Sequence, residues 1–449
     1  MDSRIKTIGI IIFGAMAVIS VIIGIIALML PDAEESPITS SGGEYNPFGQ
    51  SGERDFGTQP GSPNPFGESG SEAGSPAPIT PSGTVADGRP QLRRIFTPAT
   101  GASVFSAIDA GGEIADMVRF TERASGHIYQ GFLRESAAPW KVTNTTIPRV
   151  QSSHWAISGS STAFQYLDGQ GGEAVSTFIG RIESLPESDT PSEEERVYKA
   201  LSGKSLPMDV TELTFSPDGG QVAYLLSEGA GSTLMIVRGD AAPEALTRLP
   251  LRDMTISWPT PETIYVTSKT SAFSNGFSFA ISVATGARSL VLGDVPGLAL
   301  SVNPSGTRIL YFSTNRQTLG LQSLNLESGM ITRLPLVTLP EKCAWESEVA
   351  VICGVPTQTP DNQFPDAWYR GEQTLTDLIW RINVDNGTTD FIIDPKGTLG
   401  VPLDLTNVVV APSREFVTFI DKPTNTLWSV YIPKAVTFGE TQSENSDAD

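Results

Sequence analysis

The pattern of apolar and polar residues repeats along most of the chain at a nearly constant interval. An apolar strand is followed by a Pro/Ser/Gly turn and a second apolar strand, as in residues 213–224. The equivalent inner-strand residues Phe215, Trp258, Val302 and Trp345 are separated by 43, 44 and 43 positions. Four strands in a repeat of about 40–45 residues are typical of a β-propeller blade. The sequence therefore predicts an all-β protein with a β-propeller fold.

The number of repeats predicts seven four-stranded blades between residues 91 and 433. The seven inner strands are expected around Val104, Trp155, Phe215, Trp258, Val302, Trp345 and Val410. The last repeat has only three strands of its own, and residues 92–97 have the pattern of a fourth. We expect this N-terminal strand to complete the last blade, because ring closure removes exposed strand edges. Six and eight blades are the alternatives, since the first two repeats are irregular.

Residues 8–30 are predicted to form a transmembrane signal-anchor helix. This run of 23 residues carries no charge, and as a helix it would extend about 34 Å, enough to cross a hydrocarbon core of roughly 30 Å. Arg4 and Lys6 precede it, and Asp32 follows. The positive-inside rule therefore places residues 1–7 in the cytoplasm and the propeller outside, in the periplasm or at the cell surface. A cleaved signal peptide is the alternative, although its apolar region is normally shorter.

Two segments outside the repeats have the composition of disordered chain. Half of residues 31–90 are Gly, Pro or Ser, and such a segment buries too little apolar surface to offset the entropy of ordering. We expect it to be a linker, and we expect residues 434–449 to be an acidic disordered tail. The net charge of −20 argues against nucleic acid as a partner, because phosphates require a cationic surface.

The turn at residues 216–219, Ser-Pro-Asp-Gly, resembles the repeat of TolB-type propellers, relatives of the WD40 group found in bacterial envelopes. It is flanked by Phe215 and by residues 222–224, Val-Ala-Tyr. The copy at residues 303–306, Asn-Pro-Ser-Gly, does not keep the Asp, and the copy at residues 411–414, Ala-Pro-Ser-Arg, keeps neither the Asp nor the Gly. The resemblance concerns the repeat and the fold, and it implies an extracytoplasmic protein-interaction platform.

No linear motif predicts catalysis, a metal or a cofactor. The chain has two histidines, His127 and His154, which fall in different predicted blades. Neither belongs to a zinc, nucleophile-elbow or nucleotide-binding motif. The alternative function is a hydrolase acting on a glycan or a lactone, with carboxylates from separate blades converging on the central channel. Such a site would leave no linear motif.

Cys343 and Cys353 are predicted to form a disulfide. They lie on either side of a predicted hairpin centred on residue 348, so they should face each other across two antiparallel strands. Opposed residues are close enough for a disulfide after a small local twist, and oxidation is permitted outside the cytoplasm. A pair of free thiols is the alternative.

The insertion at residues 354–375 is the candidate binding surface. The side chains predicted to contact a partner are Phe364, Asp366, Trp368, Tyr369 and Arg370. Aromatic residues and arginine anchor protein interfaces, and aromatic rings also stack on sugars. The alternative is that these aromatics pack onto their own blade. Residues 270–276 occupy the corresponding loop of an earlier blade, so both loops should lie on one face.

From these features we expect a membrane-anchored, extracytoplasmic propeller without enzymatic activity. It would act as a protein-interaction scaffold or as a ligand-binding subunit of the cell envelope. Envelope proteins or peptides are the expected partners, and a small ligand or a glycan is the alternative.

Overall fold

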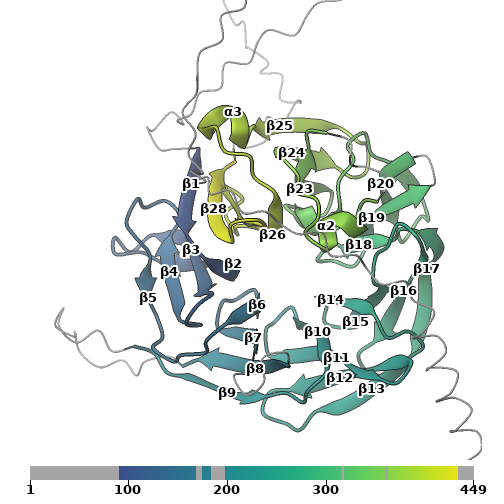
Figure 1. The fold of residues 1–449 in the computed structure, drawn as a ribbon, viewed down its shortest axis with the longest axis horizontal. Helices are drawn as coiled ribbons and strands as arrows, with labels where there is room; N and C mark the ends of the chain where they lie inside the picture. The colour runs from purple at the N-terminus through teal and green to yellow at the C-terminus, as the bar shows by residue number, and fades with distance from the viewer. Residues whose placement is uncertain are drawn as a thin grey trace, which may run out of the picture. The chain divides into compact units, whose positions relative to one another are not determined.

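The computed structural model describes residues 91–167, 174–183, 198–315, 318–358, 360 and 363–432. In this part, seven four-stranded antiparallel sheets are arranged around a central opening (Figure 1). This confirms the seven-bladed propeller. The predicted membrane helix at 8–30, the linker at 31–90 and the tail at 434–449 lie outside the described residues. Within the described residues, no helix is long and apolar enough to cross a membrane.

Blades 1 to 6 each consist of four strands that are consecutive in the sequence and run from the inside of the ring to the outside. The strands of blades 1 to 3 are β2 (Ala99–Ile108), β3 (Ile114–Glu122), β4 (Ile128–Phe132), β5 (Trp140–Lys141), β6 (Val150–Trp155), β7 (Ser161–Leu167), β8 (Val175–Ile182), β9 (Leu201–Ser205), β10 (Val210–Phe215), β11 (Gln221–Glu228), β12 (Gly231–Arg238) and β13 (Glu244–Leu249). The strands of blades 4 to 6 are β14 (Met254–Thr260), β15 (Thr263–Ser268), β16 (Asn275–Ser282), β17 (Arg288–Pro296), β18 (Ala299–Val302), β19 (Arg308–Asn315), β20 (Thr318–Asn325), β21 (Ile331–Arg333), β22 (Cys343–Trp345), β23 (Ala350–Pro356), β24 (Asp377–Asn383) and β25 (Thr389–Ile393).

The seventh blade is completed by the N-terminal strand. It consists of β26 (Leu405–Val410), β27 (Phe416–Asp421) and β28 (Thr426–Tyr431), with β1 (Leu92–Phe96) paired antiparallel to β28. Leu92 lies opposite Val430 and packs in the same apolar core as that residue. The predicted closure of the ring is therefore confirmed.

In blades 3 and 5, the turn between the first two strands is held by a polar side chain. In blade 3, Ser216 Oγ accepts a hydrogen bond from the backbone N–H of Gln221 at 2.9 Å. In blade 5, Asn303 Oδ1 accepts the equivalent bond from Arg308 N at 2.9 Å. Gly219 has a φ of 73°, a conformation that glycine adopts without steric cost. Different residues thus satisfy the same backbone donor, which explains why the repeat varies in sequence.

Apolar contacts between neighbouring blades form the core. Between blades 6 and 7, for example, Ile352 and Ile379 pack with Val417 and Phe419, and all four side chains are fully buried. Burial of one such side chain contributes about 1.5–3 kcal/mol. The blades therefore provide a rigid support for the loops at their ends.

Cys343 and Cys353 form a disulfide between β22 and β23, with an S–S distance of 2.12 Å. They are directly opposed, as are Trp345 and Val351, which is the register expected from the sequence. The bridge ties the inner strand of blade 6 to its neighbour, immediately before the insertion that follows β23.

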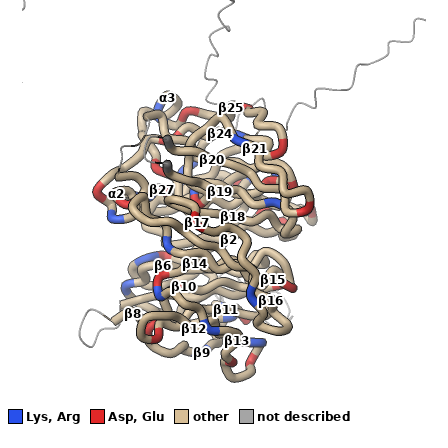
Figure 2. Tube along the Cα trace, turned by 90° about the vertical axis from the view of Figure 1, so that its right-hand side faces the viewer, with Lys and Arg blue, Asp and Glu red and all other residues tan. Residues whose placement is uncertain are grey.

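In the part of the chain that the structure describes, three short helices interrupt the strand pattern: η1 (Pro340–Lys342), α2 (Asp366–Tyr369) and α3 (Pro395–Leu399). The 3-10 helix η1 precedes the inner strand of blade 6, whereas α2 lies in the insertion between β23 and β24. Figure 1 shows α2 on the inner side of the ring, and Figure 2 shows it at one edge after a turn of 90°. In each blade the loop between the second and third strands, which in blade 6 carries α2, emerges at the same end of the ring. We call this end of the ring the α2 face.

Candidate functional site

The insertion after β23 is fixed to the propeller by two of the aromatic residues that the sequence singled out. Phe364 is fully buried, and its ring meets that of Phe312 edge-on, with 5.7 Å between centroids. Trp368 is 3% exposed and belongs to the same apolar cluster. These two side chains are buried in the core and position α2. A binding role stays a prediction for all five residues of the insertion, and Asp366, Tyr369 and Arg370 are the less buried of them.

A buried ionic network holds the inner side of the insertion. The indole N–H of Trp368 donates to both carboxylate oxygens of Asp404, at 3.0 and 2.9 Å. Lys342 Nζ lies 2.5 Å from Asp404 Oδ1 and 2.8 Å from Asp377 Oδ2, and the three side chains are at most 1% exposed. The backbone N–H of Leu375 also donates to Asp404, at 2.9 Å. The network thus joins η1, the insertion and blade 7.

A second lysine also contacts Trp368. The ammonium of Lys422, in the turn after β27, lies 4.1 Å from the Trp368 ring centroid and donates a hydrogen bond to the Trp368 carbonyl. Burial lowers the pKa of Lys422. A desolvated cation over an indole face is a favourable contact. The ammonium groups of Lys342 and Lys422 thus both lie near the indole of Trp368 and help to hold α2.

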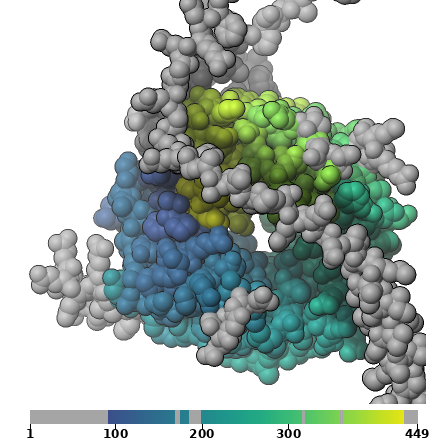
Figure 3. Space-filling view, viewed as in Figure 1, coloured from purple at the N-terminus to yellow at the C-terminus, as the bar shows by residue number. Residues whose placement is uncertain are grey.

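The outer side of α2 is tied to blade 4. Asp366 Oδ2 accepts a hydrogen bond from the backbone N–H of Ala272 at 2.7 Å. Ala272 lies in the loop between β15 and β16, so the two loops do share one face. The hydroxyl of Tyr369 donates to the Glu341 carboxylate, with distances of 2.7 and 2.6 Å to its two oxygens. These bonds link the α2 segment to the blade 4 loop and to η1. The space-filling view shows the opening at the centre of the ring (Figure 3).

Charged groups from three blades interact at this channel mouth, which we define by Glu212 of β10, Lys269 and Glu341. Burial raises the pKa of Glu212 to about 7, with the negative charge of Glu341 acting in the same direction and the positive charge of Lys269 opposing it. Desolvation also raises the pKa of Glu341, while the hydrogen bond from Tyr369 and the charge of Lys342 oppose that change. The mouth therefore contains one carboxyl group, that of Glu212, with a pKa near neutral pH.

The α2 face also presents an exposed aromatic ring that the sequence analysis did not single out. Phe273 is 74% exposed, and it follows Ala272 in the loop that Asp366 holds. On α2, the guanidinium of Arg370 is exposed and pairs with Glu372 at 2.8 and 2.7 Å. The only available signal for Phe273 was its position within residues 270–276.

Neither histidine is among the residues that define the channel mouth. His154, on β6, lines a channel cavity of about 230 Å³ together with Thr214 and Asn407, and burial lowers its pKa. His127 is near Thr146 and Lys141, at 3.2 and 3.3 Å. Among the described residues, no three His, Cys, Asp or Glu side chains are grouped so that they could hold a metal ion.

Charges of both signs are interspersed on the side of the propeller shown in Figure 2, where no continuous basic stripe is visible. The α2 segment carries Asp366, Arg370 and Glu372 within seven residues. A partner that binds the α2 face would therefore contact charges of both signs around the exposed side chain of Phe273.

Comparison with known proteins places the likeness at the level of the fold. No family model and no curated protein matches the sequence. Among solved structures, TolB from Acinetobacter baumannii is 10% identical with a TM-score of 0.40, and the match covers 64% of this chain and 62% of TolB, less than two thirds of that protein. An oligogalacturonate lyase from Vibrio parahaemolyticus is 8% identical with a TM-score of 0.47, covering 76% and 94% of the two chains. The Swd1 propeller domain of Myceliophteria thermophila is 10% identical with a TM-score of 0.44, covering 76% and 100%. The chain is thus similar in fold, and in fold only, to TolB-like and WD40 propellers.

Proposed function

We propose that this protein is a binding platform whose α2 face contacts a protein or peptide partner. The observation that carries the proposal is Phe273, an aromatic ring 74% exposed on a loop that is already fixed by Asp366. Exposed aromatic side chains and arginines are enriched at the centre of interfaces. Because the loop is held before a partner arrives, little conformational entropy is lost on binding. Phe273 would supply the apolar anchor, and Arg370 would supply a charged contact beside it.

The platform would act outside the cytoplasm, tethered by a signal anchor at residues 8–30 and supported by the linker at 31–90. The disulfide between Cys343 and Cys353 supports an oxidising compartment, because such bonds are rare in the reducing cytosol. The partner is then a component of the cell envelope. Protease added outside intact cells or spheroplasts should cleave within residues 31–90 and release a compact fragment. Full protection of the chain would refute the topology.

The binding role can be tested with full-length, C-terminally tagged protein. Crosslinking in native membranes and affinity purification should identify a discrete partner, and the dissociation constant should then be measured with both purified proteins. Phe273→Ala should weaken binding by at least about tenfold, the usual cost of truncating an interface anchor. The matched control is Leu290→Ala, which alters a side chain 60% exposed on the outer strand β17. Equal affinities of the wild type and Phe273→Ala would contradict the proposal.

A second candidate function is supported by Glu212. A carboxyl group with a pKa of about 7 beside a second carboxylate, Glu341, is suited to general acid–base catalysis at neutral pH. This arrangement would fit hydrolysis of a glycan or a lactone at the channel mouth. Substrate panels of both classes should be tested with the wild type, Glu212→Gln and Phe273→Ala. Turnover that is lost only in Glu212→Gln would favour the enzyme, whereas no turnover by the wild type would remove this candidate.

A further inference from the structure

A cavity of about 530 Å³ lies between blades 2 and 3, away from the α2 face. Its rim includes Gly219 from the turn between β10 and β11, and Gly239 from the turn between β12 and β13. These turns join the first strand to the second and the third to the fourth. They are therefore at the end of the blades opposite to the loops between second and third strands, such as the α2 insertion. The cavity is within the size range of sites for small ligands and short peptides.

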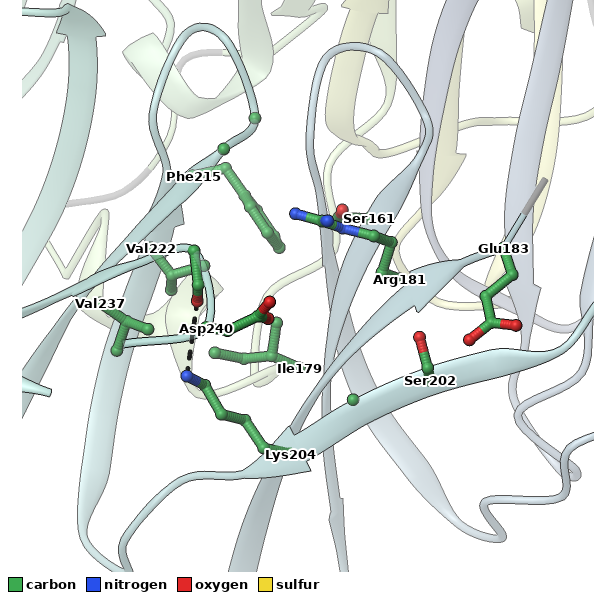
Figure 4. A pocket seen from close by; sticks show the side chains of 14 residues that line it. Ser161, Ile179, Arg181, Glu183, Ser202, Lys204, Phe215, Val222, Val237 and Asp240 are labelled. Carbon is green, nitrogen blue, oxygen red and sulfur yellow. Dashed lines mark hydrogen bonds between the residues drawn. The ribbon is translucent and has the colours of Figure 1, made fainter. Parts of the chain in front are cut away.

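The side of the cavity formed by blade 2 carries a row of three polar side chains. Arg181 on β8 lies directly opposite Ser161 on β7 and directly opposite Ser202 on β9. Directly opposed residues on neighbouring strands project from the same face of a sheet. Figure 4 shows Arg181 extending across the cavity toward Phe215, with Ser161 and Ser202 on either side of its strand. A guanidinium group is therefore presented to the cavity from a strand that has a serine on each neighbouring strand.

The two cations of the cavity differ in their availability. Lys204 Nζ donates to the carbonyl of Ala241 at 2.9 Å and to that of Gly239 at 3.5 Å, so it joins the rim of blade 2 to the rim of blade 3. Within the described residues, no hydrogen bond or ion pair involves the guanidinium of Arg181, which is exposed. An arginine offers two parallel N–H donors that match the two oxygens of a carboxylate. Arg181 is thus the group that can take an anionic ligand.

The other walls of the cavity indicate which further groups a ligand would carry. Glu183 and Asp240 are exposed and place two carboxylates on the rim. Their charge repels a ligand with several negative groups and attracts an ammonium or guanidinium group. The floor is apolar and is formed by Ile179, Phe215, Val222 and Val237. A ligand that fits these walls has one carboxylate, one cation and an aliphatic portion between them.

We propose that the cavity between blades 2 and 3 binds a short peptide segment that contains an acidic and a basic residue. The acidic side chain pairs with the guanidinium of Arg181. The basic side chain lies against Asp240 or Glu183, and an aliphatic residue between them covers the apolar floor. This site is independent of the α2 face, so the protein has two binding surfaces at opposite ends of its blades.

The proposal is tested by calorimetric titration of the full-length protein in detergent with three synthetic peptides. The first is acetyl-Ala-Glu-Leu-Lys-amide, and the other two replace either the glutamate or the lysine by glutamine. The zwitterionic peptide should bind at least about tenfold more tightly than either replacement, since each loses one charge-assisted contact. Arg181→Gln should lower the affinity for the zwitterionic peptide to that of the peptide without glutamate, and it should not weaken the latter further.

The matched control is Arg333→Gln, which removes an exposed arginine on β21 of blade 5. This variant should bind all three peptides as the wild type does, and both variants should retain the wild-type melting temperature because both side chains are exposed. Three outcomes would overturn the proposal: no binding of any peptide at millimolar concentration, equal binding by Arg181→Gln and the wild type, and tighter binding of inorganic phosphate than of the zwitterionic peptide.

Discussion

Replacing Lys342 by methionine would test whether the buried ionic network supports the α2 face. The lysine is completely buried and is the shared cation of Asp377, at 2.8 Å, and of Asp404, at 2.5 Å. Methionine has a similar length without the charge, so the substitution removes the cation that the two buried carboxylates share. Removal of one partner from a buried ion pair costs about 3–5 kcal/mol. We expect the free energy of unfolding at pH 7 to fall by about this amount.

The pH dependence of the loss provides an independent check. Burial raises the pKa of Asp377 to about 6 in the folded protein, above the ordinary value of 3.8, even with Lys342 present. Removal of the cation raises it further, so the folded Lys342→Met variant takes up protons at a pH where the unfolded chain does not. Its stability must then increase as the pH falls toward 5, and the deficit relative to the wild type must become smaller.

Urea denaturation followed by tryptophan fluorescence at pH 7 and pH 5 measures both effects. Lys396→Met, the same substitution at an exposed position of α3, is the matched control and should be close to neutral. A loss below about 1 kcal/mol at pH 7, or a deficit that is larger at pH 5, would refute the view that Lys342 compensates two buried carboxylates.

Three further outcomes follow from the same structure. Cys343→Ser should lower the free energy of unfolding by about 2–3 kcal/mol. The wild type should show no free thiol under denaturing, non-reducing conditions, and two titratable thiols would contradict the disulfide. Glu212→Gln should be more stable than the wild type at pH 8. The pKa of Glu212 is raised in the folded protein, so its ionisation destabilises the fold as the pH rises from about 4.5 to 7. In urea titrations the difference in stability should vanish below pH 4.5, and a difference that does not change with pH would be inconsistent with this cause. Trp368→Phe removes the hydrogen bonds to Asp404 and should cost about 1–3 kcal/mol in thermal or urea unfolding, whereas no loss would show that the indole N–H does not hold α2.

Much of the fold could be predicted because strand period and turn chemistry are local properties of the sequence. The spacing of Phe215, Trp258 and Val302 indicated the blades, and the missing fourth strand of the last repeat indicated that residues 92–97 close the ring. The opposed positions of Cys343 and Cys353 followed from the centre of one hairpin. Each of these predictions depends on residues that are near one another in the chain, or on the number of strands in a repeat.

The candidate sites could not be predicted in the same way. Glu212 and Glu341 come from blades 3 and 6, and no sequence interval relates them. The aromatic residues of the insertion have the same composition whether they face a partner or the core, and only the folded structure shows that Phe364 and Trp368 are buried. Similarly, Arg181 became significant because two serines lie beside it on adjacent strands.

The pairing of β1 with β28 has a consequence for how the domain loses its structure. A linear array of repeats can fray from either end, because its terminal units have a neighbour on one side only. Here the first strand is held by the last blade, and Leu92 is buried in the core between blades 6 and 7. No blade is therefore terminal, and the ring can open only if β1 detaches and exposes the edge of β28. We expect the seven blades to unfold as one cooperative unit, with amide exchange in β1 setting the rate at which the others become accessible.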